Sequence, residues 1–417
     1  MRAVAQMEHD GIPMDIETLG LFRHNWGGIK ENLVGAVDAE YGVYDDGVFK
    51  QDRFAAYLIK QGIPWPTTES GRLATDDQTF RDRAKVYPQV SALRELRHTL
   101  SEMKLEALEV GSDGRNRTML KPFASRSGRN QPSNNKFVFG PSVWIRGLIK
   151  PRPGYSIAYV DWSMQEIAIA AALSGDQALM QAYTSGDPYL EFARMAGAVP
   201  HDATKQSHPK ERACFKQCML ATSYGQREHG LAEKLGTSIA HARNLLRQHF
   251  ETFPQFWKWS QSMVDSAMLS GSVSTVFGWT LHTIGNDNPR SLGNFPMQAH
   301  GAEMMRLACS LATENGITVC CPIHDALLIE APTGQIEGAV TATQSYMAEA
   351  GRIVLDGFEV RSDAKVINWP DRYQDEDRGK TMWDTVFRLA TEMTLTSNSN
   401  ARTDISIDVN GHLKCQY

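Results

Sequence analysis

The sequence predicts an α+β fold in which a small antiparallel sheet is combined with a larger number of helices. An apolar segment over 155–161 ends at a carboxylate and indicates a strand. Two further apolar runs over 316–330 flank a His-Asp pair, which is typical of a hairpin and therefore of antiparallel pairing. The stretch from about 165 to 270 between these strands is mostly helical in pattern.

The remaining elements follow from periodicity and punctuation. We expect residues 1–110 to be mainly helical, because apolar positions recur at three-and-four spacing over 91–105. Glycines at possible turn positions indicate a second hairpin over 271–282. In the last part of the chain, we expect a helix from Met297 to Asn315, a second helix over 335–351 and a strand over 358–366. Residues 391–417 are rich in Ser, Thr and Asn, so we expect them to form a loosely ordered tail.

Length and composition describe an ordinary globular chain with more than one subdomain. The chain has 417 residues, of which 42% are hydrophobic and 22% charged. No apolar run approaches the roughly 20 residues that a membrane span needs, so we expect no membrane partner. The six cysteines lack the paired spacing of a zinc site or a disulfide framework and indicate the reduced thiols of a cytoplasmic protein.

The net charge of -5 does not favour nucleic-acid binding, but the charges are unevenly distributed. The 39 residues from Gly114 to Arg152 contain nine basic side chains and no acidic one. Such a strip is either a solvated loop or a surface that follows a phosphate backbone. Its place directly before the strand over 155–161 favours the second interpretation.

Two aspartates at strand ends are the candidate metal ligands. Asp161 follows an apolar strand and could be the N-cap of the next helix, but Ser163 is an equally good cap. Asp325 lies in the hairpin turn, where Asp is also common for conformational reasons. Two strands that each present an Asp at one sheet edge can hold two divalent cations about 3.5–4 Å apart. Mg²⁺ needs only one or two carboxylates in addition to substrate phosphates.

A helix with cations on one face is the most specific segment. Arg212, Lys216, Leu220 and Tyr224 are spaced by four, so they fall along one slowly drifting face. Lys216 would act as a point charge on phosphate oxygens and could donate a proton to a leaving pyrophosphate. The alternative is a solvated cationic face. The apolar and aromatic continuation through Leu220 and Tyr224 argues against it, because such side chains can stack on a base or sugar.

Taken together, these segments resemble the motifs of family A DNA polymerases, the group of bacterial DNA polymerase I and of phage polymerases. The resemblance covers about residues 5–370. It rests on Asp161, Ser163 and Glu166 as motif A, on Arg212, Lys216, Leu220, Tyr224 and Gly225 as the O helix, on His324 and Asp325 as motif C, on Ser127-Gly128-Arg129, and on Arg290 with Asn294-Phe-Pro-Met-Gln298.

The resemblance implies a right-hand fold with thumb, palm and fingers. The expected divisions are a helical thumb region over 1–110, a first palm segment with the basic strip over 111–165, fingers over 166–284, a second palm segment over 285–390 and the tail over 391–417. The antiparallel sheet would belong to the palm.

The resemblance also implies an activity: template-directed addition of deoxynucleotides to a primer 3′ end in DNA replication or repair. The implied cofactors are two Mg²⁺ ions, for which Mn²⁺ could substitute, and the implied partners are primer–template DNA and deoxynucleoside triphosphates. We expect a monomer associated with the nucleoid. The implied metal ligands are Asp161, Asp325 and the backbone carbonyl of Trp162, and Lys216 joins the two aspartates as a catalytic residue.

The resemblance assigns two further groups of residues to binding. The nucleotide would be bound by Arg212, Lys216, Leu220, Tyr224 and Glu166, with Glu166 gating the sugar. The DNA would be bound by Arg129, Arg146, Arg290, Asn294, Gln298 and His324.

Two departures from the family pattern keep alternatives open. Ala326 stands where the family has Glu after His-Asp, and Leu220 stands where it has Phe or Tyr. Because the sequence begins at the polymerase region, we expect no exonuclease domain. The alternatives are an enzyme resembling single-subunit RNA polymerases, against which Glu166 argues, and a catalytically silent module that binds primer–template.

Overall fold

The computed structural model describes residues 1–102, 105–133, 136–140, 142–223, 225–283, 288–376 and 379–403. The chain divides into two compact units. Unit 1 consists of residues 1–11, 119–132 and 154–368, and unit 2 of residues 12–118, 133–153 and 369–417. The basic strip is therefore shared between the two units.

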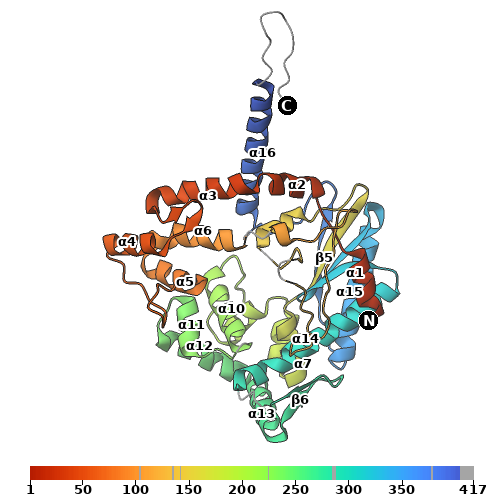
Figure 1. Cartoon of the computed structure of the whole chain (residues 1–417). Helices are drawn as coiled ribbons and strands as arrows, with labels where there is room; N and C mark the ends of the chain where they lie inside the picture. Colours follow the sequence, from red (N-terminus) through yellow and green to blue (C-terminus); the bar gives the residue numbers. More distant parts are fainter. Residues whose placement is uncertain are drawn as a thin grey trace, which may run out of the picture. The chain divides into compact units, whose positions relative to one another are not determined.

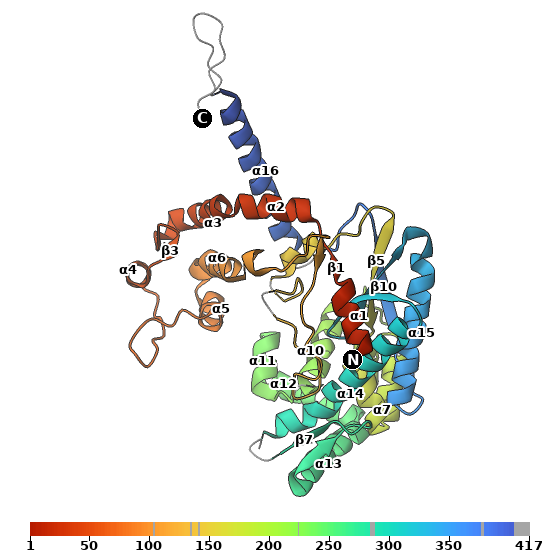
Figure 2. The same cartoon turned by 45° about the vertical axis from the view of Figure 1, so that its right-hand side comes forward.

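Unit 1 is built on a four-stranded antiparallel sheet with the strand order β10-β5-β9-β8. Its strands are β5 (Tyr155–Trp162), β8 (Thr318–Ile323), β9 (Ala326–Pro332) and β10 (Ser362–Asn368). Helix α15 (Ile336–Val354) packs against β5, β9 and β10, as Figures 1 and 2 show, whereas α1 (Arg2–Asp10) contacts β8. Most side chains of the central strands β5 and β9 are apolar and buried. The predicted strand over 155–161 and the predicted hairpin over 316–330 are confirmed.

The last predicted strand was only partly right. It begins at Ser362, four residues later than expected, and continues to Asn368. Phe358 and Arg361 instead contact Tyr183, whose hydroxyl accepts a hydrogen bond from the Arg361 backbone N–H at 2.9 Å. These tertiary contacts take the preceding segment away from the sheet.

The middle of unit 1 is helical, as predicted. Its elements are α7 (Gln165–Ser174), α8 (Gln177–Thr184), α9 (Pro188–Met195), α10 (Pro209–Ser223), α11 (Glu228–Leu235), α12 (Ile239–Thr252), α13 (Pro254–Ser270), β6 (Ser272–Ser274) and β7 (Thr280–His282). Buried Asp176 joins two of them: one oxygen caps α8 through Leu179 N–H, and the other accepts from the N–H groups of Gln255 and Phe256 at 3.0 Å. A single carboxylate thus satisfies donors at the start of two helices.

Helix α14 (Pro289–Glu314) begins eight residues before the expected start at Met297. The helix continues through Pro296, although proline is unfavourable inside a helix. The N-cap is Asn288, whose side chain accepts a hydrogen bond from Arg290 N–H at 3.1 Å. The longer helix carries Arg290, Asn294 and Gln298 on one rigid element.

Unit 2 is mostly helical, and its described residues include two apolar clusters. Its elements are β1 (Ile12–Pro13), α2 (Ile16–His24), α3 (Trp26–Tyr41), β2 (Tyr44–Asp45), β3 (Val48–Phe49), α4 (Gln51–Gln61), α5 (Asp77–Val86), α6 (Ser91–Glu102), β4 (Arg115–Asn116), the 3₁₀ helix η3 (Val143–Leu148) and α16 (Lys380–Thr403). One cluster is formed by α3 to α6 around Phe54 and Phe80. In the other, Phe22 and Trp144 pack against Trp383 of α16.

Two expected boundaries differ from the units of the structure. Helix α1 belongs with the sheet of unit 1 rather than with the helical region over 1–110, and residues 369–390 belong to unit 2. The expected loose tail was wrong for 391–403, because α16 extends to Thr403. Residues 404–417 lie outside the described part. In the part of the chain that the structure describes, no helix combines the length and apolar character needed to cross a membrane.

Candidate active site

The two candidate metal-binding aspartates lie together at one end of the sheet. Asp161 is in β5, in register with Ala326 of β9 and with Asp363 of β10. Asp325 occupies the turn between β8 and β9, and its backbone carbonyl accepts a hydrogen bond from Trp162 N–H at 3.1 Å. Cross-strand pairing therefore fixes the acidic segments to one another.

Neither Asp161 nor Ser163 caps helix α7. The N-cap is Met164, which has left-handed backbone geometry (φ 53°) and makes no side-chain capping bond. The Ser163 hydroxyl donates instead to Asp363 at 2.5 Å. The capping interpretation of Asp161 is thus excluded, and so is the expected capping role of Ser163.

The electrostatics of this sheet end disfavour negative charge. Burial raises the pKa of Asp161 to about 7, with further contributions from the charges of Asp325 and Asp363. Burial also raises the pKa of Asp325, although a backbone hydrogen bond, the Arg129 guanidinium and the His324 ring oppose the shift. The Asp161 Oδ1 atom is buried and has no hydrogen-bond partner. A bound cation would compensate the like charges of these partly buried carboxylates.

His324 lies in the hairpin turn with a positive φ of 52° and is exposed. A non-glycine residue in this region carries some backbone strain, which the surrounding hairpin must hold. Trp162 ends β5 and is in register with Ser362. Trp162 directly follows Asp161 in the chain, and the role of its backbone carbonyl as a metal ligand stays a prediction.

Glu166 lies in the first turn of α7, beside two other predicted residues. Gln298 Nε2 donates to a Glu166 carboxylate oxygen at 3.0 Å, and an Arg129 terminal nitrogen lies 4.0 Å from the same oxygen. The structure therefore brings together a predicted sugar-gating residue and two predicted DNA-binding residues.

The cations of α10 have local partners. Arg212 Nε donates to an Asp187 oxygen at 2.5 Å. The Arg212 guanidinium and the Lys216 ammonium lie 5.4 Å and 5.7 Å from the centre of the Tyr189 ring. Arg212 and Lys216 thus share one face of the helix, as the spacing by four predicted. Leu220 is half-buried on the same helix.

The remaining predicted residues are more dispersed. Tyr224 lies outside the described residues. Arg290 is exposed at the start of α14, and Asn294 is half-buried with an unpaired Oδ1 atom. Gly225 has a positive φ of 61°, and a Cβ there would lie 3.2 Å from Arg290 Cγ, so this turn approaches α14 closely. Arg146 belongs to unit 2, where its guanidinium lies 5.3 Å from the centre of the Phe139 ring.

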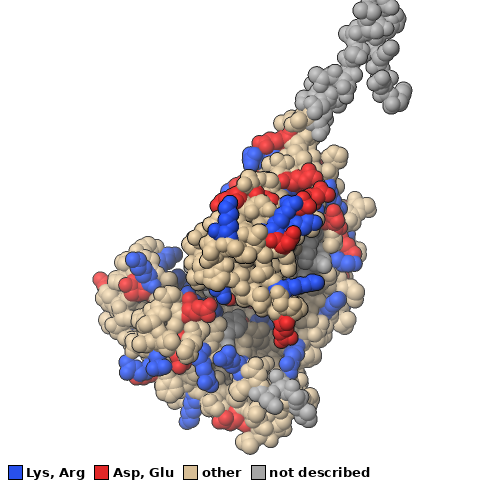
Figure 3. All heavy atoms as spheres, turned by 60° about the vertical axis from the view of Figure 1, so that its left-hand side comes forward, with Lys and Arg blue, Asp and Glu red and all other residues tan. Residues whose placement is uncertain are grey.

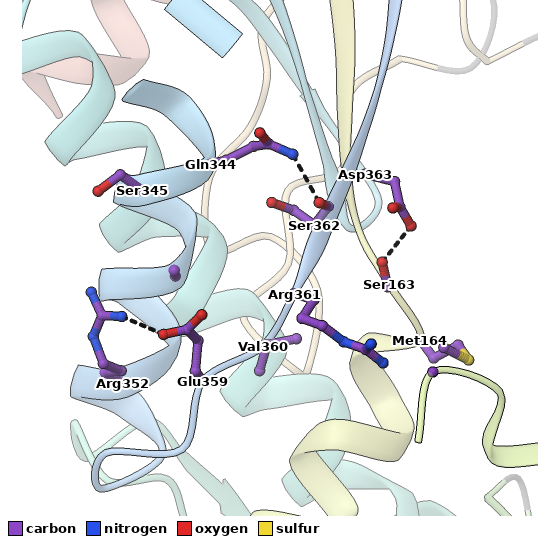
Figure 4. A pocket seen from close by; sticks show the side chains of 12 residues that line it. Ser163, Met164, Gln344, Ser345, Arg352, Glu359, Val360, Arg361, Ser362 and Asp363 are labelled. Carbon is purple, nitrogen blue, oxygen red and sulfur yellow. Dashed lines mark hydrogen bonds and ion pairs between the residues drawn. The ribbon is translucent and has the colours of Figure 1, made fainter. Parts of the chain in front are cut away.

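A pocket of about 560 Å³ lies next to the acidic sheet end. Figure 4 shows Ser163 and Asp363 pointing toward one another, and Arg361 directed toward Met164. On the other side, Gln344 of α15 donates to the Ser362 carbonyl at 2.8 Å. The walls are mainly polar, so the pocket differs from an apolar small-molecule site.

Three site residues were missed by the sequence interpretation. Asp363 is one of several acidic residues in its region, and only the register of β10 places it opposite Asp161. Asp187 before Pro188 is a readable N-cap signal for α9, but its contact with Arg212 depends on how α9 packs against α10. Tyr189 carries no motif that would have identified it.

Charge at the surface is mixed. On the face drawn in Figure 3, Lys and Arg side chains alternate with Asp and Glu side chains. Several cations of the basic strip are paired within unit 2, including Arg117 with Asp113 and Lys150 with Asp15. Part of the strip's positive charge is therefore already compensated.

Comparison with known proteins identifies relatives of this chain. The model of DNA polymerase family A matches residues 59–367. The chain is 26% identical to DNA polymerase I of Aquifex aeolicus over 88% of this chain and 65% of that protein. It is 25% identical to the DNA polymerase of Mycobacterium phage D29 over 85% of this chain and 59% of that protein.

A solved structure has the same fold. It is the POL domain of Pol1 from M. smegmatis in complex with DNA primer–template and dNTP, with a TM-score of 0.71 at 22% identity, over 88% of this chain and 68% of that one. The chain spans about two thirds or less of the length of the curated relatives described above. Since the family model matches well over half of the chain, the protein belongs to DNA polymerase family A.

Proposed function

We propose that the chain is a DNA-directed DNA polymerase that extends a primer 3′ end by two-metal-ion nucleotidyl transfer. The observation that carries the proposal is the pair Asp161 and Asp325, which the sheet holds together at one end with a buried and unpaired carboxylate oxygen. The family relationship supports the reaction class.

The donor set of the site fits Mg²⁺, or Mn²⁺ as its substitute. Asp161, Asp325 and the Trp162 carbonyl offer oxygen ligands, which both ions accept. Among the described residues there is no group of three or more His, Cys, Asp or Glu side chains that could hold a metal. Two carboxylates suffice when substrate phosphates provide further ligands. When bound, the two ions would activate the primer hydroxyl and stabilise the charge of the phosphates.

The nucleotide would bind between the sheet end and α10. Arg212 and Lys216 would bind the triphosphate, and Lys216 would donate a proton to the leaving pyrophosphate. Glu166 would crowd the sugar C2′ position, while Leu220 and Tyr224 would line the nucleotide pocket. Arg212 would have to exchange Asp187 for phosphate oxygens, since both are anionic partners.

Primer–template DNA would be positioned by phosphate and minor-groove contacts. The residues we assign to this role are Arg129, Arg146, Arg290, Asn294, Gln298 and His324. We assign the sheet of unit 1 to the palm, the helical region over 166–284 to the fingers and the helical N-terminal region to the thumb. The protein would act on DNA as a monomer associated with the nucleoid.

A primer-extension assay tests the proposal. The purified chain is incubated with a labelled primer–template, Mg²⁺ and the four deoxynucleotides, and a parallel reaction contains ribonucleotides. Template-dependent extension with deoxynucleotides is the expected result. Extension with ribonucleotides at comparable rates would indicate the RNA polymerase alternative. Binding of the DNA without any extension would indicate a silent primer–template-binding module.

A further inference from the structure

We propose that Trp279 and Arg306 are positioning residues that act through Arg129. They clamp the turn that carries Arg129 and so fix its guanidinium beside Glu166 and the acidic sheet end. The inference rests on the proposed function, because it assumes that Arg129 positions primer–template DNA.

The turn is short and built from polar residues. Gly128 N–H donates to the Ser125 carbonyl at 2.9 Å, and Arg129 N–H donates to the Ser125 hydroxyl at 2.7 Å. Gly128 has a positive φ of 75°. These local bonds define the shape of the turn, but they do not attach it to the rest of unit 1.

Two side chains from other elements make that attachment. Trp279 Nε1 donates to the Arg126 carbonyl at 3.0 Å, and Arg306 donates to the Gly128 carbonyl at 2.8 Å. Phe123 lies between them: its ring stacks on Trp279 with centroids 5.6 Å apart, and the Arg306 guanidinium lies 4.7 Å from its centre. The arrangement combines two hydrogen bonds with aromatic stacking and a cation–π contact.

Trp279 and Arg306 approach the backbone of the turn most closely at Gly128. A Cβ at this position would lie 3.1 Å from the Trp279 ring and 3.2 Å from an Arg306 terminal nitrogen. The indole and the guanidinium therefore approach the backbone at a distance that a side chain would obstruct. The residue that follows this tight contact is Arg129.

Helix α14 links the clamp to Glu166. Arg306 belongs to this helix, and so does Gln298, which donates to Glu166. Trp279 is connected to it through Thr275, whose hydroxyl accepts from Trp279 N–H at 2.9 Å and donates to Glu303. Helix α14 thus holds both the turn that carries Arg129 and the side chain of Glu166.

A purely structural role is the competing explanation for these contacts. Phe123 is 44% exposed, but Trp279 is half-buried and packs against the apolar cluster that includes Leu292 and Phe295, so the melting temperature has to be measured beside the rate. What the clamp does fix is the backbone on both sides of Gly128. Small displacements of a positioning group can reduce a rate by about a hundredfold, which makes such a clamp useful.

A double-mutant cycle on the full chain tests the inference. The variants are Trp279→Ala, Arg129→Ala and their combination. The readouts are single-turnover incorporation of one dNTP on a defined primer–template, the dissociation constant for that DNA, and the melting temperature. Phe277→Ala is the matched control, since Phe277 is an exposed aromatic of the same hairpin outside the stack.

If the clamp acts through Arg129, Trp279→Ala should slow incorporation at least about tenfold. The double variant should be within about twofold of Arg129→Ala alone, because the clamp has no function without Arg129. Phe277→Ala should incorporate at the wild-type rate. Trp279→Phe keeps the stack but removes the indole donor, so it should lie between wild type and Trp279→Ala.

Gly128→Ala provides a second route if Trp279→Ala does not fold. It displaces the turn without removing any core side chain, and it should show the same lack of additivity with Arg129→Ala. Multiplicative losses in the cycle, or a slow Arg129→Ala with a fast Trp279→Ala, would overturn the clamp and leave the proposed function intact. An Arg129→Ala variant as fast as wild type would instead refute the assigned role of Arg129, and with it the clamp.

Discussion

The acidic end of the sheet and the cationic face of α10 are both charged regions of unit 1, but they differ in how their charges are compensated. At the sheet end, Asp161 has a buried, unpaired oxygen and like-charged neighbours that contribute to a pKa of about 7. On α10, Arg212 is bound to Asp187, and both cations lie near the Tyr189 ring.

This difference shows how each region would meet its ligand. The carboxylates gain a counterion when a cation binds, so binding relieves an unfavourable arrangement. The α10 cations already have an anion and an aromatic ring as partners, so a triphosphate has to compete for them. The first region should therefore be essential for the reaction, and the second should set nucleotide affinity, with Lys216 also acting as the proposed proton donor.

The largest expected effect comes from removing either carboxylate. Asp161→Ala or Asp325→Ala should abolish primer extension while DNA binding remains nearly unchanged, because each variant removes a metal ligand without altering the phosphate contacts. Extension assays and gel-shift binding measure the two effects. Asp265→Ala, on the exposed side of α13, is the matched control and should extend normally. Retention of more than a few per cent of extension would contradict the two-metal assignment.

Removal of a cation from α10 should have the next largest effect. Lys216→Ala should weaken dNTP binding about ten- to a hundredfold, since a hydrogen bond from a charged group is worth roughly 1.5–3 kcal/mol. The dependence of the single-turnover rate on dNTP concentration gives the affinity. Lys258→Ala removes an exposed cation of α13 and should leave the affinity unaltered. Equal affinities for Lys216→Ala and wild type would show that Lys216 does not bind the triphosphate.

Glu166 extends the comparison to the start of α7, where it lies beside Gln298 and Arg129. Glu166→Ala should raise the use of ribonucleotides relative to deoxyribonucleotides at least about tenfold, or roughly 1.4 kcal/mol, since crowding at C2′ is removed. Glu166→Gln keeps the size of the side chain and should retain most of the discrimination. Competition between matched nucleotides measures the ratio. An unchanged ratio in Glu166→Ala would mean that another residue gates the sugar.

Variants of Leu220 test whether the apolar part of the α10 face contacts the nucleotide. Leu220→Tyr should relax discrimination against dideoxynucleotides several-fold to about tenfold, because a hydroxyl can replace a hydrogen bond worth roughly 0.5–1.5 kcal/mol. Leu220→Phe adds the ring without the hydroxyl and should not change the ratio. Single-turnover incorporation of matched deoxy and dideoxy nucleotides separates the cases. If the Tyr variant slows both nucleotides equally, Leu220 is only a packing residue.

The smallest expected effect concerns the competition for Arg212. Asp187→Asn should tighten dNTP binding several-fold at low salt, because it removes the anion that pairs with Arg212 but keeps an amide oxygen able to cap α9. Titration of the single-turnover rate with dNTP at two ionic strengths measures the change. Weaker binding in Asp187→Asn would mean that Asp187 holds Arg212 in place for the triphosphate.

Much of the site was predictable because its residues lie in short segments with strong local patterns. The strand before Asp161 and the hairpin around Asp325 are apolar runs of strand length, and the α10 cations recur at helical spacing. Element boundaries were less predictable. Helix α14 passes through Pro296, and the segment before β10 is drawn away by Tyr183, because tertiary contacts override local signals.

By itself, the sequence determined the α+β class, the candidacy of Asp161 and of Asp325 beside apolar strand runs, and the cationic face of α10, since each depends on residues close together in the chain. Only the tertiary structure decided that Asp363 lies opposite Asp161, that Asp187 holds Arg212 and that Trp279 and Arg306 clamp the turn of Arg129. These contacts join residues from 25 to 202 positions apart. Strand register and helix packing set such contacts, and no local periodicity encodes them.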